Sequence, residues 1–142
     1  MQVLVDTSVW SLALRRVLPT PATSGDASAA PKAVAMLQDL ITDSRASMIG
    51  AIRQELLSGI KSANQFQTLS DALSGFEDIA LSRADYELAA QFFNTCRSKG
   101  IQGSNTDFLI CAVASSRKRP ILTTDLDFAM YKLHLPIELV AV

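Results

Sequence analysis

The chain of 142 residues has little of several residue types on which common classes of protein depend. It contains one histidine, His134, which excludes any mechanism that needs two imidazole groups. Its two cysteines, Cys96 and Cys111, are too few for a disulfide framework or, by themselves, for a four-ligand zinc site. No apolar run approaches the roughly 20 residues of a membrane-spanning helix. The first residues lack a basic region and reach an acid at Asp6, so we expect no signal peptide.

The chain also lacks an excess of either charge. Its 13 basic and 14 acidic residues give a net charge of −1, which excludes a DNA-wrapping basic protein and a polybasic membrane-surface binder. What it has is a hydrophobic content of 49%, enough for a substantial core. At this length we expect one soluble domain over residues 1–142, located in the cytoplasm.

Short apolar runs alternate with segments of helical periodicity along the chain. We predict strands at 2–5, 47–51, 79–81, 120–122 (extended as far as 124) and 137–140. We predict helices at 8–16, through 34–41, at 52–60, 63–74, 82–98, 106–116 and 126–131, and a mobile loop over 19–31. Ser8 is a candidate N-cap, Phe66 is expected on the inner face of its helix, and the residues from Ser82 to Asp85 resemble a capping box. Strands separated by helices predict right-handed crossovers and a parallel sheet. The predicted fold is therefore an α/β three-layer sandwich, a short parallel sheet flanked by helices.

Four acidic residues stand out by their positions in this pattern. Asp6 and Asp125 follow predicted strands, and ligands of open α/β sheets bind at the carboxyl ends of the strands. Asp107 lies in the first turn of a predicted helix, and Glu55 lies at the border of another helix's apolar face. We expect these side chains to gather at one edge of the sheet.

Each acid also has an ordinary explanation. Asp107 and Asp127 would suit the positive end of a helix dipole, Asp125 would suit a helix N-cap, and Glu55 would suit a solvated helix face. Asp6 is harder to explain in this way, because an apolar strand seldom ends in an unpaired acid. Clustered carboxylates repel one another unless a cation compensates them, and hard oxygen ligands select Mg²⁺ or Mn²⁺. The arrangement therefore predicts metal-assisted hydrolysis of a phosphate ester.

Four sequence blocks, in order from one end of the chain to the other, resemble the motifs of PIN-domain ribonucleases, especially the VapC toxins of type II toxin–antitoxin pairs. The blocks are Val5-Asp6-Thr7-Ser8-Val9-Trp10, Arg53-Gln54-Glu55-Leu56-Leu57-Ser58-Gly59, Asn105-Thr106-Asp107-Phe108-Leu109-Ile110-Cys111-Ala112 and Leu122-Thr123-Thr124-Asp125-Leu126-Asp127-Phe128. The predicted short parallel sheet agrees with the fold of that family.

The resemblance implies a function and a site. Asp6, Glu55, Asp107 and Asp125 take the four acidic positions of the family's catalytic site, with Asp127 as an accessory acid. The implied metal ligands are Asp6, Asp107, Asp125 and Asp127, and the implied cofactor is Mg²⁺ or Mn²⁺. The implied activity is hydrolysis of RNA by a toxin. The implied partners are an RNA substrate and a small antitoxin, which binds a homodimer in a heterotetramer or larger assembly.

Three alternatives remain open at this point. A phosphoacceptor receiver domain has a similar length and acids at strand ends, although it needs paired acids after the first strand and a lysine after the last. A PIN-like domain that binds RNA without cutting it is the second alternative. The third is a PIN-type nuclease that processes RNA and is not a toxin. We also expect Trp10 and Phe128 to pack in the core rather than to stack on bases.

Overall fold

The computed structural model describes residues 1–14 and 30–142. Its elements, in chain order, are β1 (Val3–Val5), α1 (Thr7–Ala13), α2 (Ala30–Thr42), β2 (Ala46–Ser47), α3 (Gly50–Leu57), α4 (Ala63–Leu73), α5 (Arg83–Ser98), α6 (Asn105–Arg117), β3 (Ile121–Leu122) and α7 (Asp127–Lys132). None of these helices is long and apolar enough to cross a membrane. The predicted loop over 19–31 lies outside the described residues, except that Ala30 and Pro31 belong to α2.

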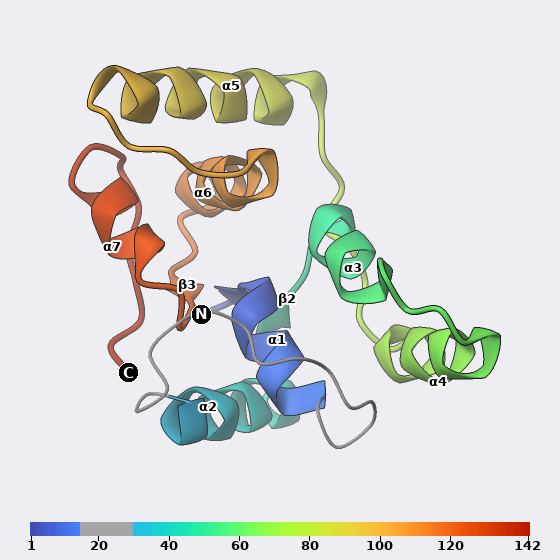
Figure 1. The fold of residues 1–142 in the computed structure, drawn as a ribbon. Coiled ribbons are helices and arrows are strands. Elements are labelled where there is room, and N and C mark those ends of the chain that lie inside the picture. Colours follow the sequence, from blue (N-terminus) through green and yellow to red (C-terminus); the bar gives the residue numbers. More distant parts are fainter. Residues whose placement is uncertain (15–29) are drawn as a thin grey trace.

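A parallel sheet of three strands forms the middle layer, in the order β2-β1-β3. Leu4 of the central strand pairs with Ser47 on one side and with Ile121 on the other. All three residues of β1 are buried, as expected for a strand that is covered on both faces. Figure 1 shows α5 and α6 stacked on one side of the sheet and α1 and α2 on the other. This arrangement confirms the predicted α/β fold.

Helix α6 is the most deeply buried helix of the described part. Seven consecutive residues of it, from Phe108 to Ala114, are buried, because α6 lies between the sheet and α5. A helix that is apolar all round belongs in a core. Asp107 begins this run at its N-terminal end, so a rigid, fully packed element holds that acid in place. Trp10 and Phe128 are also buried, which confirms their predicted place in the core.

Two of the predicted strands are wrong. Asp78, which precedes the segment 79–81, forms one isolated parallel bridge with Met48, and Leu139 forms another with Ile121. Because each pairing is limited to a single bridge, neither segment forms a strand. The strand predicted at 47–51 overlaps β2 (Ala46–Ser47) at one residue only, because α3 already begins at Gly50. The strand predicted at 120–124 is shortened to β3 (Ile121–Leu122).

Two predictions about helices also need correction. Ser8 is not an N-cap, since α1 begins at Thr7 and Asp6 holds the N-cap position. Phe66 does not face the core: it is 41% exposed, because α4 buries only Leu69 and Leu73. By contrast, the capping box predicted from Ser82 to Asp85 is present at the start of α5.

Candidate active site

Asp6 stands at the carboxyl end of the central strand, where the chain turns from β1 into α1. Its backbone N–H donates to the carbonyl of Leu122 at 2.9 Å, so the sheet pairing with β3 continues one residue past β1. Its side chain is only 4% exposed. A carboxylate in this position has left water almost completely, and its few protein partners must replace that solvation.

Two hydroxyls hold the Asp6 carboxylate through one of its oxygens. The hydroxyls of Thr123 and Ser8 donate to Oδ2 at 2.8 and 2.9 Å. Ser8 is in turn fixed by the backbone N–H of Thr124, which donates to its Oγ at 3.1 Å. The other oxygen, Oδ1, accepts no hydrogen bond from residues 1–14 or 30–142. The side chain is thus held at one oxygen and keeps the other available.

Asp107 is held from a different direction. The hydroxyl of Tyr131 in α7 donates to its Oδ2 at 2.7 Å, and Ser104 caps its backbone N–H at 3.0 Å. The Tyr131 ring is fully buried against Phe108 and Phe128, with centroid distances of 5.0 and 5.2 Å. Gly103 allows this approach, because a Cβ at that position would lie 2.8 Å from Cζ of Tyr131.

Asp125 and Asp127 lie in the turn between β3 and α7. The backbone N–H of Asp125 donates to the Thr123 hydroxyl at 2.9 Å, so one threonine links Asp125 to Asp6. The backbone N–H of Asp127 donates to Oδ1 of Asp125 at 2.9 Å. This local turn fixes the Asp125 side chain at the start of α7.

Glu55 stands on the exposed side of α3 and joins the site through a single bond. The Thr7 hydroxyl donates to its Oε1 at 2.6 Å, which ties α3 to the first residue of α1, next to Asp6. The structure thus links Asp6 to Asp125 through Thr123 and places Glu55 beside the residue that follows Asp6.

The electrostatics show that three of the acids share one region. Burial raises the pKa of Asp6 from 3.8 to about 6; the bonds from Thr123 and Ser8 oppose this rise, and the charges of Asp107 and Asp125 add to it. Burial also raises the pKa of Asp107, where the charge of Asp127 adds to the effect. The pKa of Asp125 rises through burial and the charges of Asp127 and Asp107. These carboxylates therefore lie close enough to repel one another.

The whole arrangement can be compared with known families. The sequence model of the PIN domain matches residues 3–132, which is nearly the whole chain. The chain belongs to the PIN domain family. The four sequence blocks that resemble PIN motifs all lie within the matched range, and the alternative of a phosphoacceptor receiver domain is thereby set aside. No curated protein sequence matches the chain significantly.

Two solved structures share this PIN fold over their full length. The crystal structure of FitAcB from Neisseria gonorrhoeae matches with a TM-score of 0.70 and 19% identity, over 99% of this chain and 97% of the other. VapBC2 from Rickettsia felis, bound to a DNA fragment from their promoter, matches with a TM-score of 0.67 and 19% identity, over 99% and 98%. At this level of identity the likeness concerns the fold.

The donor chemistry of this PIN domain fits a hard divalent cation. The Asp6 and Asp107 carboxylates accept hydrogen bonds from hydroxyls. Asp6 is buried, and its Oδ1 accepts no hydrogen bond from the described residues. Within those residues, no three acidic, histidine or cysteine side chains close on one point. Mg²⁺ commonly takes one or two protein carboxylates and keeps several waters, so a looser set of acids suits it.

Several residues of the site are absent from the sequence prediction. Ser8 is two residues from Asp6, and a hydroxyl so close to a buried acid is a signal that the sequence contains. Thr123 and Tyr131 reach Asp6 and Asp107 across 117 and 24 residues, and no local pattern marks them. Only the folded chain shows that they hold the acids.

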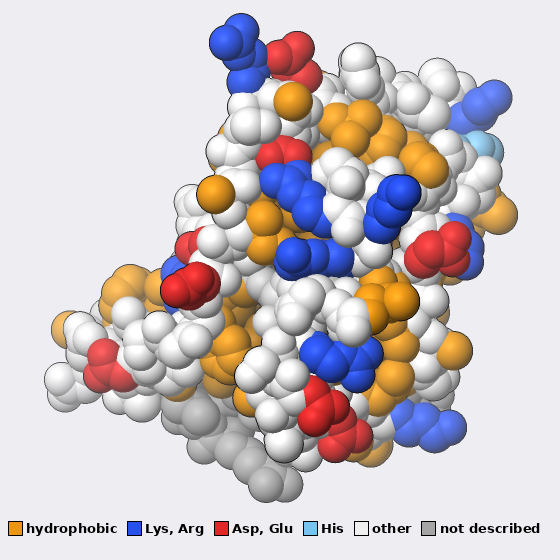
Figure 2. All heavy atoms as spheres, turned by 180° about the vertical axis from the view of Figure 1, so that it is seen from behind, with side chains coloured by type: hydrophobic (Ala, Val, Ile, Leu, Met, Phe, Trp, Pro, Cys, Tyr) orange, Lys and Arg blue, Asp and Glu red, His pale blue; other side chains and the backbone are white. Residues whose placement is uncertain are grey.

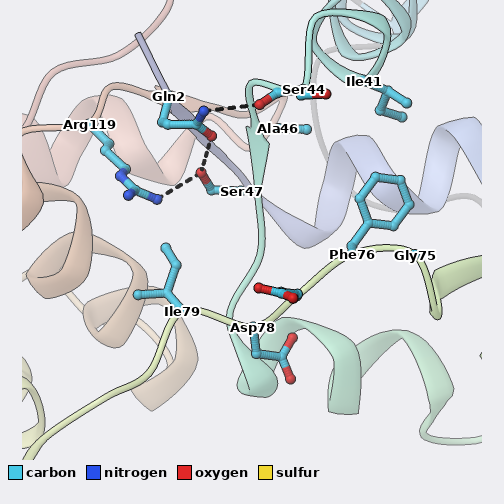
Figure 3. Close-up of a pocket in the computed structure, with 11 residues that line it drawn as sticks. Gln2, Ile41, Ser44, Ala46, Ser47, Gly75, Phe76, Asp78, Ile79 and Arg119 are labelled. Carbon is cyan, nitrogen blue, oxygen red and sulfur yellow. Dashed lines mark hydrogen bonds between the residues drawn. The ribbon is translucent and has the colours of Figure 1, made fainter.

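A separate cavity of about 590 Å³ contains none of the predicted site acids. Figure 3 shows it at the side of the sheet, where Ser47 donates to Gln2 and Arg119 donates to Ser47. Three basic residues, 117–119, follow one another at the C-terminal end of α6, about ten residues or some 15 Å along the helix from Asp107. Figure 2 shows Lys and Arg side chains gathered in the middle of the rear face of the molecule.

Proposed function

We propose that this PIN domain is a Mg²⁺- or Mn²⁺-dependent endoribonuclease that acts as the toxin of a type II toxin–antitoxin pair. The observation that carries the proposal is the Asp6 carboxylate at the end of the central strand. Its burial raises its pKa, and the charges of Asp107 and Asp125 add to that rise. Such an arrangement is unfavourable without a cation and favourable with one. The match to the PIN family and the likeness to VapC motifs support a nuclease over other metal enzymes.

In this proposal Asp6 and Asp107 hold the metal, Asp125 supports it directly or through water, and Asp127 is an accessory acid. When bound, the ion lowers the pKa of water and stabilises charge on the phosphate oxygens. Ser8 and Thr123 fix one oxygen of Asp6, and Tyr131 fixes one oxygen of Asp107, so each carboxylate presents its other oxygen. These bonds give the site its preorganisation.

Glu55 serves as the residue that orients or deprotonates the attacking water. Thr7 holds its Oε1 and leaves Oε2 as the acceptor for a water proton. Attack by water leaves a 3′-hydroxyl and a 5′-phosphate. We expect single-stranded or loop RNA as the substrate, because its splayed backbone can enter a narrow site.

The experiment is a cleavage assay on single-stranded RNA with purified protein. Mg²⁺ or Mn²⁺ supports cleavage, and EDTA and Asp6→Asn abolish it. Asp39→Asn, which neutralises an exposed acid on α2, is the matched control and retains activity. His134→Ala also retains activity, because the proposed route needs no imidazole. Products that end in a 2′,3′-cyclic phosphate, or RNA binding without cleavage, would overturn the proposed reaction.

The toxin role predicts a small antitoxin that binds this chain as a homodimer, in a heterotetramer or larger assembly. Its physical basis is the acidic edge, which an arginine of the partner can pair with bidentately. The likeness to VapBC2 supports such a partner. The test is growth: expression of the chain alone arrests growth, Asp6→Asn relieves the arrest, and the adjacent reading frame restores growth and co-purifies. A harmless wild-type chain with cleavage in vitro would indicate a PIN nuclease of RNA processing instead.

A further inference from the structure

A cavity of about 370 Å³ lies between α5 and α6, close to the proposed active site but separate from it. Tyr86, Ala90, Phe93 and Asn94 line it from α5, and Asn105 and Thr106 line it from the first turn of α6. None of the four predicted catalytic acids lines this cavity. Its volume falls in the range of small-ligand sites, and its position next to Asp107 gives it a use in the proposed reaction.

Two aromatic rings form walls of this α5–α6 cavity, and they differ in how they are packed. Phe93 packs edge to face against the buried Phe108, with a centroid distance of 5.5 Å, so its ring is fixed in position. Tyr86 is 56% exposed, although it is a large aromatic residue. The alanine at position 90 leaves open space next to the two rings. The cavity thus offers flat aromatic surface to a flat ligand.

The polar side chains that line the cavity are neutral, and one cation, Arg97, lies against a ring of its wall. The side-chain amides of Asn94 and Asn105 are exposed and form no hydrogen bond with residues 1–14 or 30–142. Each amide offers both donors and an acceptor. The guanidinium of Arg97 lies 5.1 Å from the centre of the Phe93 ring, and no acidic side chain lines the cavity. A ligand with an aromatic body, hydrogen-bonding edges and a negative group matches these features.

We propose that the α5–α6 cavity binds one nucleobase of the RNA strand whose phosphate lies at Asp107. This inference rests on the proposed ribonuclease function. Proteins recognise single-stranded RNA by stacking bases on aromatic side chains and by hydrogen bonds to base edges, which Tyr86, Phe93 and the two asparagines supply. Arg97 supplies the phosphate contact.

The path from the cavity to the acids is short. Thr106 and Asp107 are adjacent in sequence but lie on different sides of α6. An RNA strand that reaches from the cavity to Asp107 therefore passes over the N-terminal end of that helix. The distance from the cavity to Asp107 is about the 10 Å width of a helix. The N-terminus of a helix also favours binding of phosphate. The bound base therefore belongs to a nucleotide near the cleaved bond, and the cavity acts as a determinant of sequence preference.

The test measures binding of labelled single-stranded homopolymers of each base, by fluorescence anisotropy, to the nuclease-inactive Asp6→Asn protein. Tyr86→Ala weakens binding by about 5- to 100-fold, as expected for loss of one stacked base. Tyr86→Phe keeps the ring and retains affinity. Phe66→Ala removes another exposed aromatic residue, which lies outside the cavity, and leaves affinity unchanged. Asn94→Ala alters the order of affinity among the four homopolymers.

The outcomes separate this proposal from the proposed function. If wild-type protein cleaves RNA while Tyr86→Ala changes neither KM nor base preference, the nucleobase site is wrong and the nuclease stands. If Tyr86 governs RNA binding but no RNA is cleaved, the nuclease is wrong and the base site stands. If Tyr86→Ala changes the mass of the protein in light scattering and not its RNA affinity, the cavity is a contact between copies of the chain and the proposal is overturned.

Discussion

Replacing Asp6 by asparagine should make the metal-free protein more stable at neutral pH. Asp6 is 4% exposed, and its burial together with the nearby acids raises its pKa from 3.8 to about 6. The folded protein therefore resists ionisation of this carboxyl, whereas the unfolded chain does not. Asparagine has nearly the same shape, carries no charge, and keeps an oxygen that can accept from Ser8 and Thr123.

The size and pH dependence follow from the two pKa values of Asp6. Between about pH 4 and 6 the folded state holds a proton that the unfolded state has released, so stability falls as the pH rises through this window. A shift of roughly 2 pKa units corresponds to about 3 kcal/mol at pH 7.5. Near pH 4 the unfolded carboxyl is only about half ionised and most of the cost has disappeared, and well below pH 4 both states are protonated. Asp6→Asn should therefore gain about 3 kcal/mol over wild type at pH 7.5 and only a small part of that near pH 4.

The assay is urea unfolding in EDTA at a series of pH values between 4 and 7.5. Asp39→Asn on the exposed face of α2 is the control for loss of one negative charge and should follow wild type at every pH. An Asp6→Asn protein that is less stable than wild type at pH 7.5, or whose advantage is the same at pH 4 and 7.5, would refute this reasoning. Either result would mean that burial of charge does not set the energetics of Asp6.

Three other perturbations test parts of the same structure. Millimolar Mg²⁺ or Mn²⁺ should raise the Tm of wild type, since a bound ion adds about 2.7 kcal/mol to the free energy of unfolding at a hundredfold excess over Kd. A Tm that does not change with either ion would contradict a metal site. Gly103→Ala should lower both the Tm and the affinity for Mn²⁺, because the new Cβ displaces Tyr131. Gly75→Ala is the control and should match wild type, because the space next to Gly75 is open. A Gly103→Ala protein with unchanged Tm and Mn²⁺ affinity would contradict the packing of Tyr131 against Gly103. Asp85→Asn should lose about 2 kcal/mol in urea unfolding, because it leaves Arg117 without its partner. The Arg117 guanidinium holds the pKa of Asp85 at about 2. The stabilisation by this ion pair is therefore present above pH 4 and disappears as the pH falls through 2. Equal stability of wild type and Asp85→Asn at pH 7 would contradict this prediction.

Most of the fold can be predicted from local sequence patterns, because the spacing of apolar residues indicates which face of each segment is buried. The apolar run at Val3–Val5 gives the central strand, and the box from Ser82 to Asp85 gives the start of α5. The strands predicted at 79–81 and 137–140 are wrong because their formation depends on a neighbouring segment. A strand exists only where a neighbour pairs with it along its length, and the sequence of the segment itself does not contain that information.

The candidate site is predictable in its acids and not in the groups that hold them. Asp6 and Asp125 follow strands that lie next to each other in a parallel sheet, so the chain order alone brings them to one edge. Thr123 bonds to Asp6 because β3 pairs beside β1, and Tyr131 meets Asp107 because α7 packs on α6. Those two contacts depend on tertiary packing that no local spacing encodes.

The distribution of ion pairs separates the acids that stabilise the fold from the acids of the proposed site. Among residues 1–14 and 30–142, Arg117 of α6 pairs with Asp85 of α5, and Arg53 of α3 pairs with Asp78 in the segment between α4 and α5. No lysine or arginine of these residues forms a salt bridge with Asp6, Asp107 or Asp125. The described part of the chain thus compensates its structural acids with its own cations. It holds the carboxylates of the proposed site with uncharged donors, which are hydroxyls at Asp6 and Asp107 and a backbone N–H at Asp125. Hydroxyls orient a carboxylate without cancelling its charge, so the remaining charge is what an external cation would bind.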